Sequence, residues 1–189
     1  DSSDLYFSKL KHKKNIKILK NNFNKGQSFS ILLGVKESDS NTIITLDGDC
    51  QNNPSDIPKL LKVYFNHNYS LVGGIRSKRK DSKIKIISSK IANLIRQFIL
   101  KDNCIDTGCS LKVFDRDIFL KFPFFDGLHR FLPALFIGFN ETTFFIPVEH
   151  RYRVHGKSNY GTTKRLLAGI SDLIRVLKII KKFKRKSHD

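Results

Sequence analysis

Residues Ile43–Pro54 read IITLDGDCQNNP and place two carboxylates directly after an apolar run. The run Thr42–Leu46 is rich in β-branched residues without polar alternation, which is typical of a strand in a parallel sheet covered on both faces. Open α/β sheets bind their ligands outside the carboxyl ends of the strands. Because Asp47 and Asp49 follow the run at that end, we expect them to belong to a binding site.

The spacing of the two aspartates suits a divalent cation. Side chains two residues apart in an extended segment point the same way, so Asp47 and Asp49 would face one ion, with Gln51 as a neutral oxygen ligand. Such oxygen ligands suit Mg²⁺ or Mn²⁺ and leave positions open for a diphosphate. Asp-x-Asp is also common in turns, where the carboxylate accepts backbone N–H bonds. A bound ion would relieve the repulsion between the two carboxylates.

The sequence on both sides alternates between strand and helix patterns, which favours an α/β fold with a doubly wound, mostly parallel central sheet flanked by helices. The predicted strands are residues 15–20, 42–46, 69–77 and 142–154. The predicted helices pass through residues 29–35, 57–64, 83–101 and 162–186. Residues 106–122 indicate a loop, a strand and a short helix, and residues 129–139 indicate the start of a buried helix.

Length and composition favour one packed domain. The 189 residues suffice for one α/β core, and 40% hydrophobic content with 16 Phe is typical of a globular protein. Cys50, Cys104 and Cys109 form neither a CxxC pair nor an even disulfide set, which favours a reducing compartment and argues against structural zinc. No run of about 18 apolar residues is present. The chain starts at Asp1 without Met, so we expect a fragment that lacks its opening segment.

The chain is strongly basic, with 35 Lys and Arg against 17 Asp and Glu and a formal net charge of +18. Such a surface attracts polyanions. Nucleic acid, anionic lipid head groups and phosphorylated small molecules all fit, and charge alone does not choose among them.

Six sequence blocks carry a resemblance: NKGQS, IITLDGDCQNNPSDIPKL, VGGIRSKRKD, DTGCSLKVFDRDIF, HRFLPALF and HRYRVHGKSNYG. In this order they resemble family 2 glycosyltransferases of the polyprenyl-phosphate type, such as dolichyl-phosphate mannosyltransferase and bacterial undecaprenyl-phosphate sugar transferases. The resemblance implies a GT-A type nucleotide-sugar-binding fold. Chains of that family open with a strand and a DDGS loop for the nucleotide base. DSSD at Asp1–Asp4 resembles the end of that loop, so we expect the first strands to be missing.

The resemblance also implies roles for individual residues. Asp47, Asp49 and Gln51 match a D-x-D-x-Q block that holds the metal and the donor diphosphate, and Asp49 is expected to be catalytic. Asp106 matches a catalytic acid near the reacting centre. The residues expected to bind the donor or its phosphates are Lys25, Asp47, Arg76, Lys85, Arg153 and Lys157, and Arg130 is expected to bind the acceptor phosphate.

A lipid monophosphate acceptor would simplify the chemistry, because its nucleophile is already an anion and needs no strong general base. The metal and Arg76 would neutralise the leaving diphosphate, while Arg130, Arg153 and Lys157 would hold the incoming phosphate in line with the anomeric carbon. The family implies a nucleotide-sugar donor, a polyprenyl phosphate acceptor, inversion at the anomeric carbon, and mannose or glucose as the transferred hexose.

The last part of the chain suggests contact with a membrane. We divide the chain into a glycosyltransferase domain over residues 1–161 and a basic amphipathic helix with a tail over residues 162–189. Each basic residue close to an anionic surface contributes about 1 kcal/mol, so the cluster would attach the protein reversibly to the cytoplasmic face of a membrane. Phe183 is expected to insert among the head groups. The alternative is an ordinary packed helix with a charged solvent face. The apolar stripe of the predicted helix consists of Leu166, Ile170, Leu173, Leu177 and Ile180.

Three rival functions fit parts of the pattern. The charge suits a nucleic-acid-binding protein, but the aromatic residues cluster in apolar runs and no known nucleic-acid-binding motif is present, so no nucleic acid partner is expected. A nucleotidyltransferase would also pair acids around Mg²⁺, but it would not explain the downstream blocks. A family 2 transferase with a soluble or polysaccharide acceptor would normally need a base near the acceptor hydroxyl.

Overall fold

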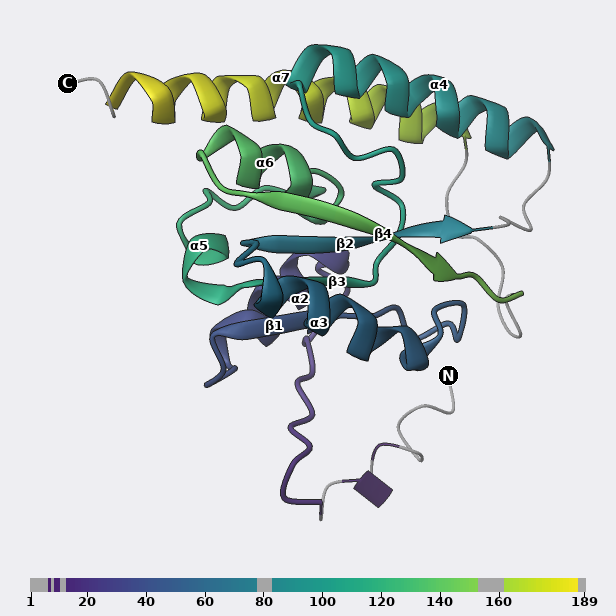
Figure 1. The fold of residues 1–189 in the computed structure, drawn as a ribbon, viewed down its shortest axis with the longest axis vertical. Helices are drawn as coiled ribbons and strands as arrows, with labels where there is room; N and C mark the ends of the chain where they lie inside the picture. The colour runs from purple at the N-terminus through teal and green to yellow at the C-terminus, as the bar shows by residue number, and fades with distance from the viewer. Residues whose placement is uncertain (1–6, 8, 11–12, 78–82, 153–161, 187–189) are drawn as a thin grey trace.

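The structure is a computed structural model that describes residues 7, 9–10, 13–77, 83–152 and 162–186 (Figure 1). Its helices and strands follow most of the predicted segments. The helices are α2 (Gly26–Lys36), α3 (Ile57–Asn66), α4 (Lys83–Leu100), α5 (Arg116–Leu120), α6 (Leu132–Gly138) and α7 (Thr162–Lys186), with 3₁₀ turns at Pro54–Asp56 and Leu128–Arg130. The strands are β1 (Thr42–Thr45), β2 (Leu71–Ser77), β3 (Lys112–Asp115) and β4 (Thr143–Glu149).

Local capping explains where two of these elements start. The Asn53 side chain accepts a hydrogen bond from the backbone N–H of Ser55 just ahead of α3. The Asp115 carboxylate accepts one from the backbone N–H of Ile118 at 2.8 Å and so ends β3 and starts α5. Side chains of this kind satisfy N–H groups that have no partner inside the helix.

The four strands form one mixed sheet in the order β1-β3-β2-β4. Strand β3 runs antiparallel to both β1 and β2, and β2 runs parallel to β4. Three strands therefore share one direction, as expected for a mostly parallel sheet flanked by helices. Strand β3 opposes them, so the sheet is mixed rather than entirely parallel. Alternation of helices and strands does not encode the direction in which a strand enters the sheet.

Two local predictions about strands are wrong. Residues 15–20 pair with no strand within the described part of the chain, and Lys17 instead forms an ion pair with Glu37 after α2. The β1 run is not covered on both faces, because β1 is an edge strand of the described sheet and Ile44 is 37% exposed. Only Ile43 of this strand is buried.

The sheet separates two hydrophobic cores, because successive side chains of a strand point to opposite faces. Leu71 and Phe114 lie in the larger core with α2, α5, α6 and α7. Val72 and Val113 lie in the smaller core, where Leu60 of α3 covers them. Aromatic contacts organise the larger core: Phe114 stacks on Phe119 with ring centres 5.2 Å apart, and Phe122 meets Phe136 edge-on at 5.1 Å.

Helix α7 packs on α6 and contributes to the larger core. Val176 is fully buried, and a Cβ at Gly138 would lie 2.4 Å from Ile180, so the two helices need a glycine at their contact. Phe183 stacks on Phe139, the residue that follows α6, with ring centres 3.9 Å apart. The prediction that Phe183 inserts among lipid head groups is therefore wrong. The division of the chain at residue 162 stays a prediction.

Within the described residues, no helix combines the length and the apolar content that crossing a membrane requires.

Candidate active site

The two aspartates lie in the turn that follows β1, and neighbouring segments hold them there. Asp47 Oδ1 accepts a hydrogen bond from Gln27 Nε2 of α2 at 2.9 Å. Asp49 Oδ1 accepts one from the backbone N–H of Gln51 at 3.1 Å, which is the turn contact that the sequence allowed. Gln51 in turn exchanges hydrogen bonds with the backbone of Arg151 after β4. Gln27 lies in the quoted NKGQS block, but it was not among the predicted site residues.

The donor atoms of this turn suit a hard cation. Asp47 and Asp49 offer carboxylate oxygens, and Gln51 uses its amide nitrogen for Arg151, which leaves the amide oxygen as its ligand atom. Among the residues that the structure describes, no three His, Cys, Asp or Glu side chains are grouped so that they could hold a metal ion. Mg²⁺ commonly uses one or two carboxylates and takes its other ligands from water and substrate phosphates. The residues present therefore fit an ion that binds together with a diphosphate.

A cavity of about 550 Å³ adjoins Asp47 between α2, β1 and β3. Its lining includes Gln27, Ser110, Lys112 and His129. Lys112 is only 4% exposed and donates a hydrogen bond to the backbone carbonyl of Cys109. A buried ammonium group is costly without partners, so Lys112 is a candidate site residue. Sequence reasoning missed it, although a lysine between apolar strand residues is an available signal.

His129 is a buried histidine that contacts the Ser28 side chain. The buried Ser28 hydroxyl oxygen accepts the backbone N–H of Gly127 at 2.9 Å and shares a hydrogen bond with His129 Nδ1 at 2.6 Å. Burial, with the charges of Arg130 and Lys112, lowers the pKa of His129 to about 4. The imidazole is therefore uncharged at neutral pH.

This environment predicts a pH-dependent stability. The unfolded chain protonates His129 with a pKa of about 6.5, so between pH 6.5 and about 4 the unfolded state binds more protons than the folded one. The free energy of unfolding therefore falls as the pH drops through this window, by on the order of 3 kcal/mol in all. His129→Asn, which keeps a hydrogen-bonding side chain beside Ser28, should remove this dependence in urea unfolding at several pH values. An unchanged slope would contradict the assignment.

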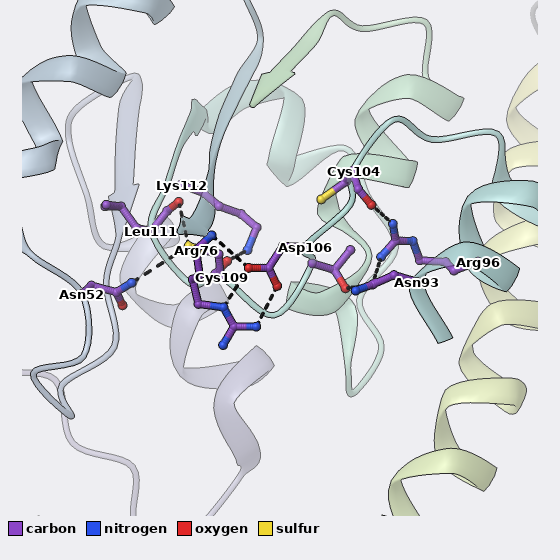
Figure 2. Close-up of polar contacts among 10 residues, drawn as sticks. Asn52, Arg76, Asn93, Arg96, Cys104, Asp106, Cys109, Leu111 and Lys112 are labelled. Carbon is purple, nitrogen blue, oxygen red and sulfur yellow. Dashed lines mark hydrogen bonds and ion pairs between the residues drawn. The ribbon is translucent and has the colours of Figure 1, made fainter. Parts of the chain in front are cut away.

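Arg76 and Asp106, predicted for different roles, form one ion pair (Figure 2). Arg76 Nε donates to Asp106 Oδ2 at 2.8 Å and Nη2 to Oδ1 at 2.7 Å, and the backbone N–H of Arg76 also donates to Oδ2 at 3.1 Å. The side chains are 15% and 7% exposed. A Cβ at Gly108 would lie 2.7 Å from Arg76 Nη2, so the glycine makes room for the guanidinium. Such bidentate pairs are strong and fix orientation.

Residues 106–110 connect this ion pair to the aspartate turn. Ser110 Oγ donates a hydrogen bond to Asn52 Oδ1 at 2.6 Å, just after the turn, and the Ser110 carbonyl accepts one from Thr45 Oγ1 at 2.7 Å. The Asn52 amide also contacts the Cys109 sulfur at 4.0 Å (Figure 2). The end of β1, the end of β2 and this loop therefore form one site.

Two other predicted residues, Arg130 and Lys25, contact other groups in the structure. Arg130 Nη2 donates to Asp172 Oδ2 of α7 at 2.7 Å, so its role at an acceptor phosphate stays a prediction. Lys25 lies over the rings of Phe23 and Phe29, at 5.0 and 4.5 Å from their centres. Lys85 belongs to the first turn of α4, and Arg153 and Lys157 lie outside the described residues.

The fold is shared with solved glycosyltransferases. A crystal structure of glucosyl-3-phosphoglycerate synthase from Mycobacterium tuberculosis, in complex with Mn²⁺, UDP-glucose and phosphoglyceric acid, matches with a TM-score of 0.57 at 12% identity. The match covers 86% of this chain and 55% of that chain. This likeness shows the fold alone, and it defines the class: a GT-A fold of the glycosyltransferases.

Sequence comparison gives the family. Residues 2–122 match Glycosyl transferase family 2, and the chain belongs to that family. It is 33% identical over 156 residues to the undecaprenyl-phosphate 4-deoxy-4-formamido-L-arabinose transferase of Edwardsiella ictaluri, covering 82% of this chain and 47% of that protein. It is 37% identical over 153 residues to the Pseudomonas aeruginosa protein of the same name, covering 81% and 44%. The chain thus spans about half the length of the curated relatives that it matches. The predicted family and GT-A fold are confirmed.

Proposed function

We propose that this chain transfers a sugar from a nucleotide-sugar donor to a polyprenyl phosphate. The observation that carries this proposal is the aspartate turn after β1 in a family 2 chain similar to undecaprenyl-phosphate sugar transferases. We keep mannose and glucose as candidate sugars. The named relatives add 4-deoxy-4-formamido-L-arabinose as a third candidate.

The aspartate turn would hold the donor through Mg²⁺ or Mn²⁺ bound by Asp47, Asp49 and Gln51. When bound, such an ion neutralises the developing charge of the diphosphate leaving group. Gln27 fixes the carboxylate of Asp47 from α2, and the contact of Asp49 with the Gln51 backbone fixes the turn itself. The chain thereby presents its oxygen ligands without having to reorganise when the donor arrives.

The acceptor supplies the nucleophile as an anion. A phosphate oxygen would attack the anomeric carbon in line, the new C–O bond would form as the bond to the diphosphate breaks, and the electron pair would leave with the diphosphate. This displacement inverts the anomeric carbon and requires no general base. Asp106 would keep the Arg76 guanidinium in a fixed orientation beside the two anions, because both of its oxygens bind that group.

A lipid acceptor requires contact with a membrane surface, and α4 offers a better apolar face than Phe183. Five apolar side chains of α4 are between 52% and 85% exposed. Helices α4 and α7 lie side by side along one side of the molecule (Figure 1). We propose that this face docks peripherally on an anionic cytoplasmic leaflet, to which exposed cations of α7 are complementary. The apolar residues are Ile87, Ile91, Leu94, Ile95 and Phe98, and the cations are Lys178, Lys181, Lys182, Lys184, Arg185 and Lys186.

Charged substitutions on α4 should weaken binding to lipid vesicles. Burying a large apolar side chain contributes about 1.5–3 kcal/mol, so Leu94→Glu and Phe98→Glu should each reduce binding to phosphatidylglycerol-containing vesicles by roughly 10-fold or more. Phe65→Glu is the matched control, because Phe65 is 64% exposed on α3, which covers the opposite face of the sheet. Sedimentation with vesicles checks this. Equal losses in all three variants, or binding that 0.5 M salt leaves unchanged, would contradict it.

The proposed transfer itself is tested with a panel of donors. The chain is incubated with Mn²⁺, a polyprenyl phosphate and radiolabelled GDP-mannose, UDP-glucose or a UDP-linked 4-deoxy-4-formamido-L-arabinose. If the chain transfers sugar to the lipid phosphate, the radiolabel should move into the organic phase with one of these donors. Tight, salt-sensitive binding to duplex DNA without binding of any nucleotide sugar would overturn the proposal in favour of a nucleic-acid-binding protein.

A further inference from the structure

A second buried ion pair joins α4 to the loop that carries Asp106. Arg96 and Asp102 are 6% and 3% exposed. Arg96 Nε donates to Asp102 Oδ2 and Nη2 to Oδ1, both at 2.9 Å. The pair lies at the start of the 101–110 loop, and Figure 2 shows Arg96 and Arg76 on opposite sides of Asp106. The site described above does not use it.

Further polar contacts extend this pair along the loop (Figure 2). Arg96 Nη2 also donates to the Cys104 carbonyl, and the Cys104 backbone N–H donates to Asp102 Oδ1 at 3.0 Å. Asn93, one turn earlier on α4, accepts hydrogen bonds at Oδ1 from Arg96 Nη1 at 2.7 Å and from Thr107 Oγ1 at 3.1 Å. We call Asn93, Arg96 and Asp102 the α4 clamp. The α4 clamp forms hydrogen bonds with the backbone of Cys104 and with the side chain of Thr107, which lie on either side of Asp106 in the sequence.

Stability alone is a weak reason for such an arrangement. A buried ion pair loses the hydration of both charges, and replacing it with apolar residues is often neutral or stabilising. The Arg96 guanidinium and the Asp102 carboxylate of the α4 clamp meet in a planar, bidentate geometry that a lysine cannot reproduce. The consequence for Asp106 is geometric: its loop is fixed to α4 on one side while its carboxylate is fixed to Arg76 on the other.

We infer that Arg96 is a positioning residue that sets the Arg76–Asp106 pair through the 102–107 loop. The inference rests on the proposed function, because that pair is assigned there to the reacting anions. The same helix carries the exposed apolar face, so α4 would link the proposed membrane-docking surface to the active site. A small misplacement of a catalytic constellation costs large factors in rate, so loosening the clamp should reduce turnover.

Two graded substitutions and one control test the inference. Arg96→Lys keeps the charge and loses the bidentate contact, and Thr107→Val removes only the hydroxyl that reaches Asn93. Both should lower kcat for sugar transfer, by roughly 10-fold or more for Arg96→Lys and roughly 3-fold for Thr107→Val, with KM for the nucleotide sugar within about 2-fold. Arg116→Lys is the control, because Arg116 binds the Val35 carbonyl at 3.0 Å, remote from the Asp106 loop.

A readout independent of transfer separates this inference from the proposed function. The Arg76 Nε–H, which donates to Asp106, should exchange with solvent at least about 10-fold faster in Arg96→Lys by ¹⁵N NMR and be unchanged in Arg116→Lys. An unchanged Arg76 Nε–H, or equal kcat per folded molecule in the Arg96 and Arg116 variants, would overturn the inference. If the Arg76 signal responds as expected while the unsubstituted chain transfers no sugar, the clamp is supported and the proposed function fails.

Discussion

Replacing Asp49 by Asn is expected to reduce Mn²⁺-dependent sugar transfer by roughly 10²–10³-fold, because it removes a carboxylate from the turn that would hold the ion and the donor diphosphate. The substitution keeps an oxygen at the position that accepts the Gln51 backbone N–H, so the turn itself should survive. The loss is therefore electrostatic rather than structural, and urea unfolding should give a free energy within about 0.5 kcal/mol of the unsubstituted chain.

Donor binding provides a second readout of the same prediction. In calorimetric titrations with Mn²⁺, the affinity for UDP should be lower in Asp49→Asn than in the unsubstituted chain. Without Mn²⁺, both chains should bind UDP equally weakly. Asp39→Asn is the matched control, because it removes the same charge from an exposed position between α2 and β1. Unchanged Mn²⁺-dependent binding and transfer in Asp49→Asn would remove the aspartates from the donor site.

Local sequence signals predicted the elements well. Helix α7 spans the predicted residues 162–186, and α4 and β1 lie within one residue of their predicted ends. These segments have long apolar periodicity or a short β-branched run bounded by turn residues, and both patterns act over a few neighbouring residues. The Ile43–Pro54 stretch likewise placed Asp47 and Asp49 directly after a strand, and the turn contact given as the alternative to an extended segment is present at Asp49.

Contacts between distant segments were not predictable in the same way. The sequence suggested Arg76 for the leaving group and Asp106 for the reacting centre, but a pattern at each position cannot show that residues 30 positions apart bind each other. Arg130 is a similar case, since its partner Asp172 lies 42 positions away on α7. The direction of β3 and the contact of Phe183 with Phe139 also depend on packing between segments, which local propensity does not determine.

Removing the charge of Asp106 is expected to destabilise the fold by about 3–5 kcal/mol, because Asp106→Ala leaves the Arg76 guanidinium largely buried without its bidentate partner. Urea unfolding measures this loss. Asp117→Asn is the control, since the Arg116–Asp117 pair is 3.4 Å long, its carboxylate side chain is 62% exposed, and such surface pairs contribute about 0–1 kcal/mol. A loss in Asp106→Ala as small as that of the control would show that solvent screens the Arg76–Asp106 pair.

A double substitution separates the support that this pair gives to the fold from its role in the reaction. Arg76→Met combined with Asp106→Leu removes both charges and fills a similar volume, so the free energy of unfolding should recover most of what Asp106→Ala loses. Transfer should stay at least about 10²-fold reduced, because the refilled site lacks the guanidinium that would act together with the metal ion on the leaving diphosphate. Recovery of both quantities would mean that the pair only holds the loop in place, and the reacting anions would then require other cations of this basic chain.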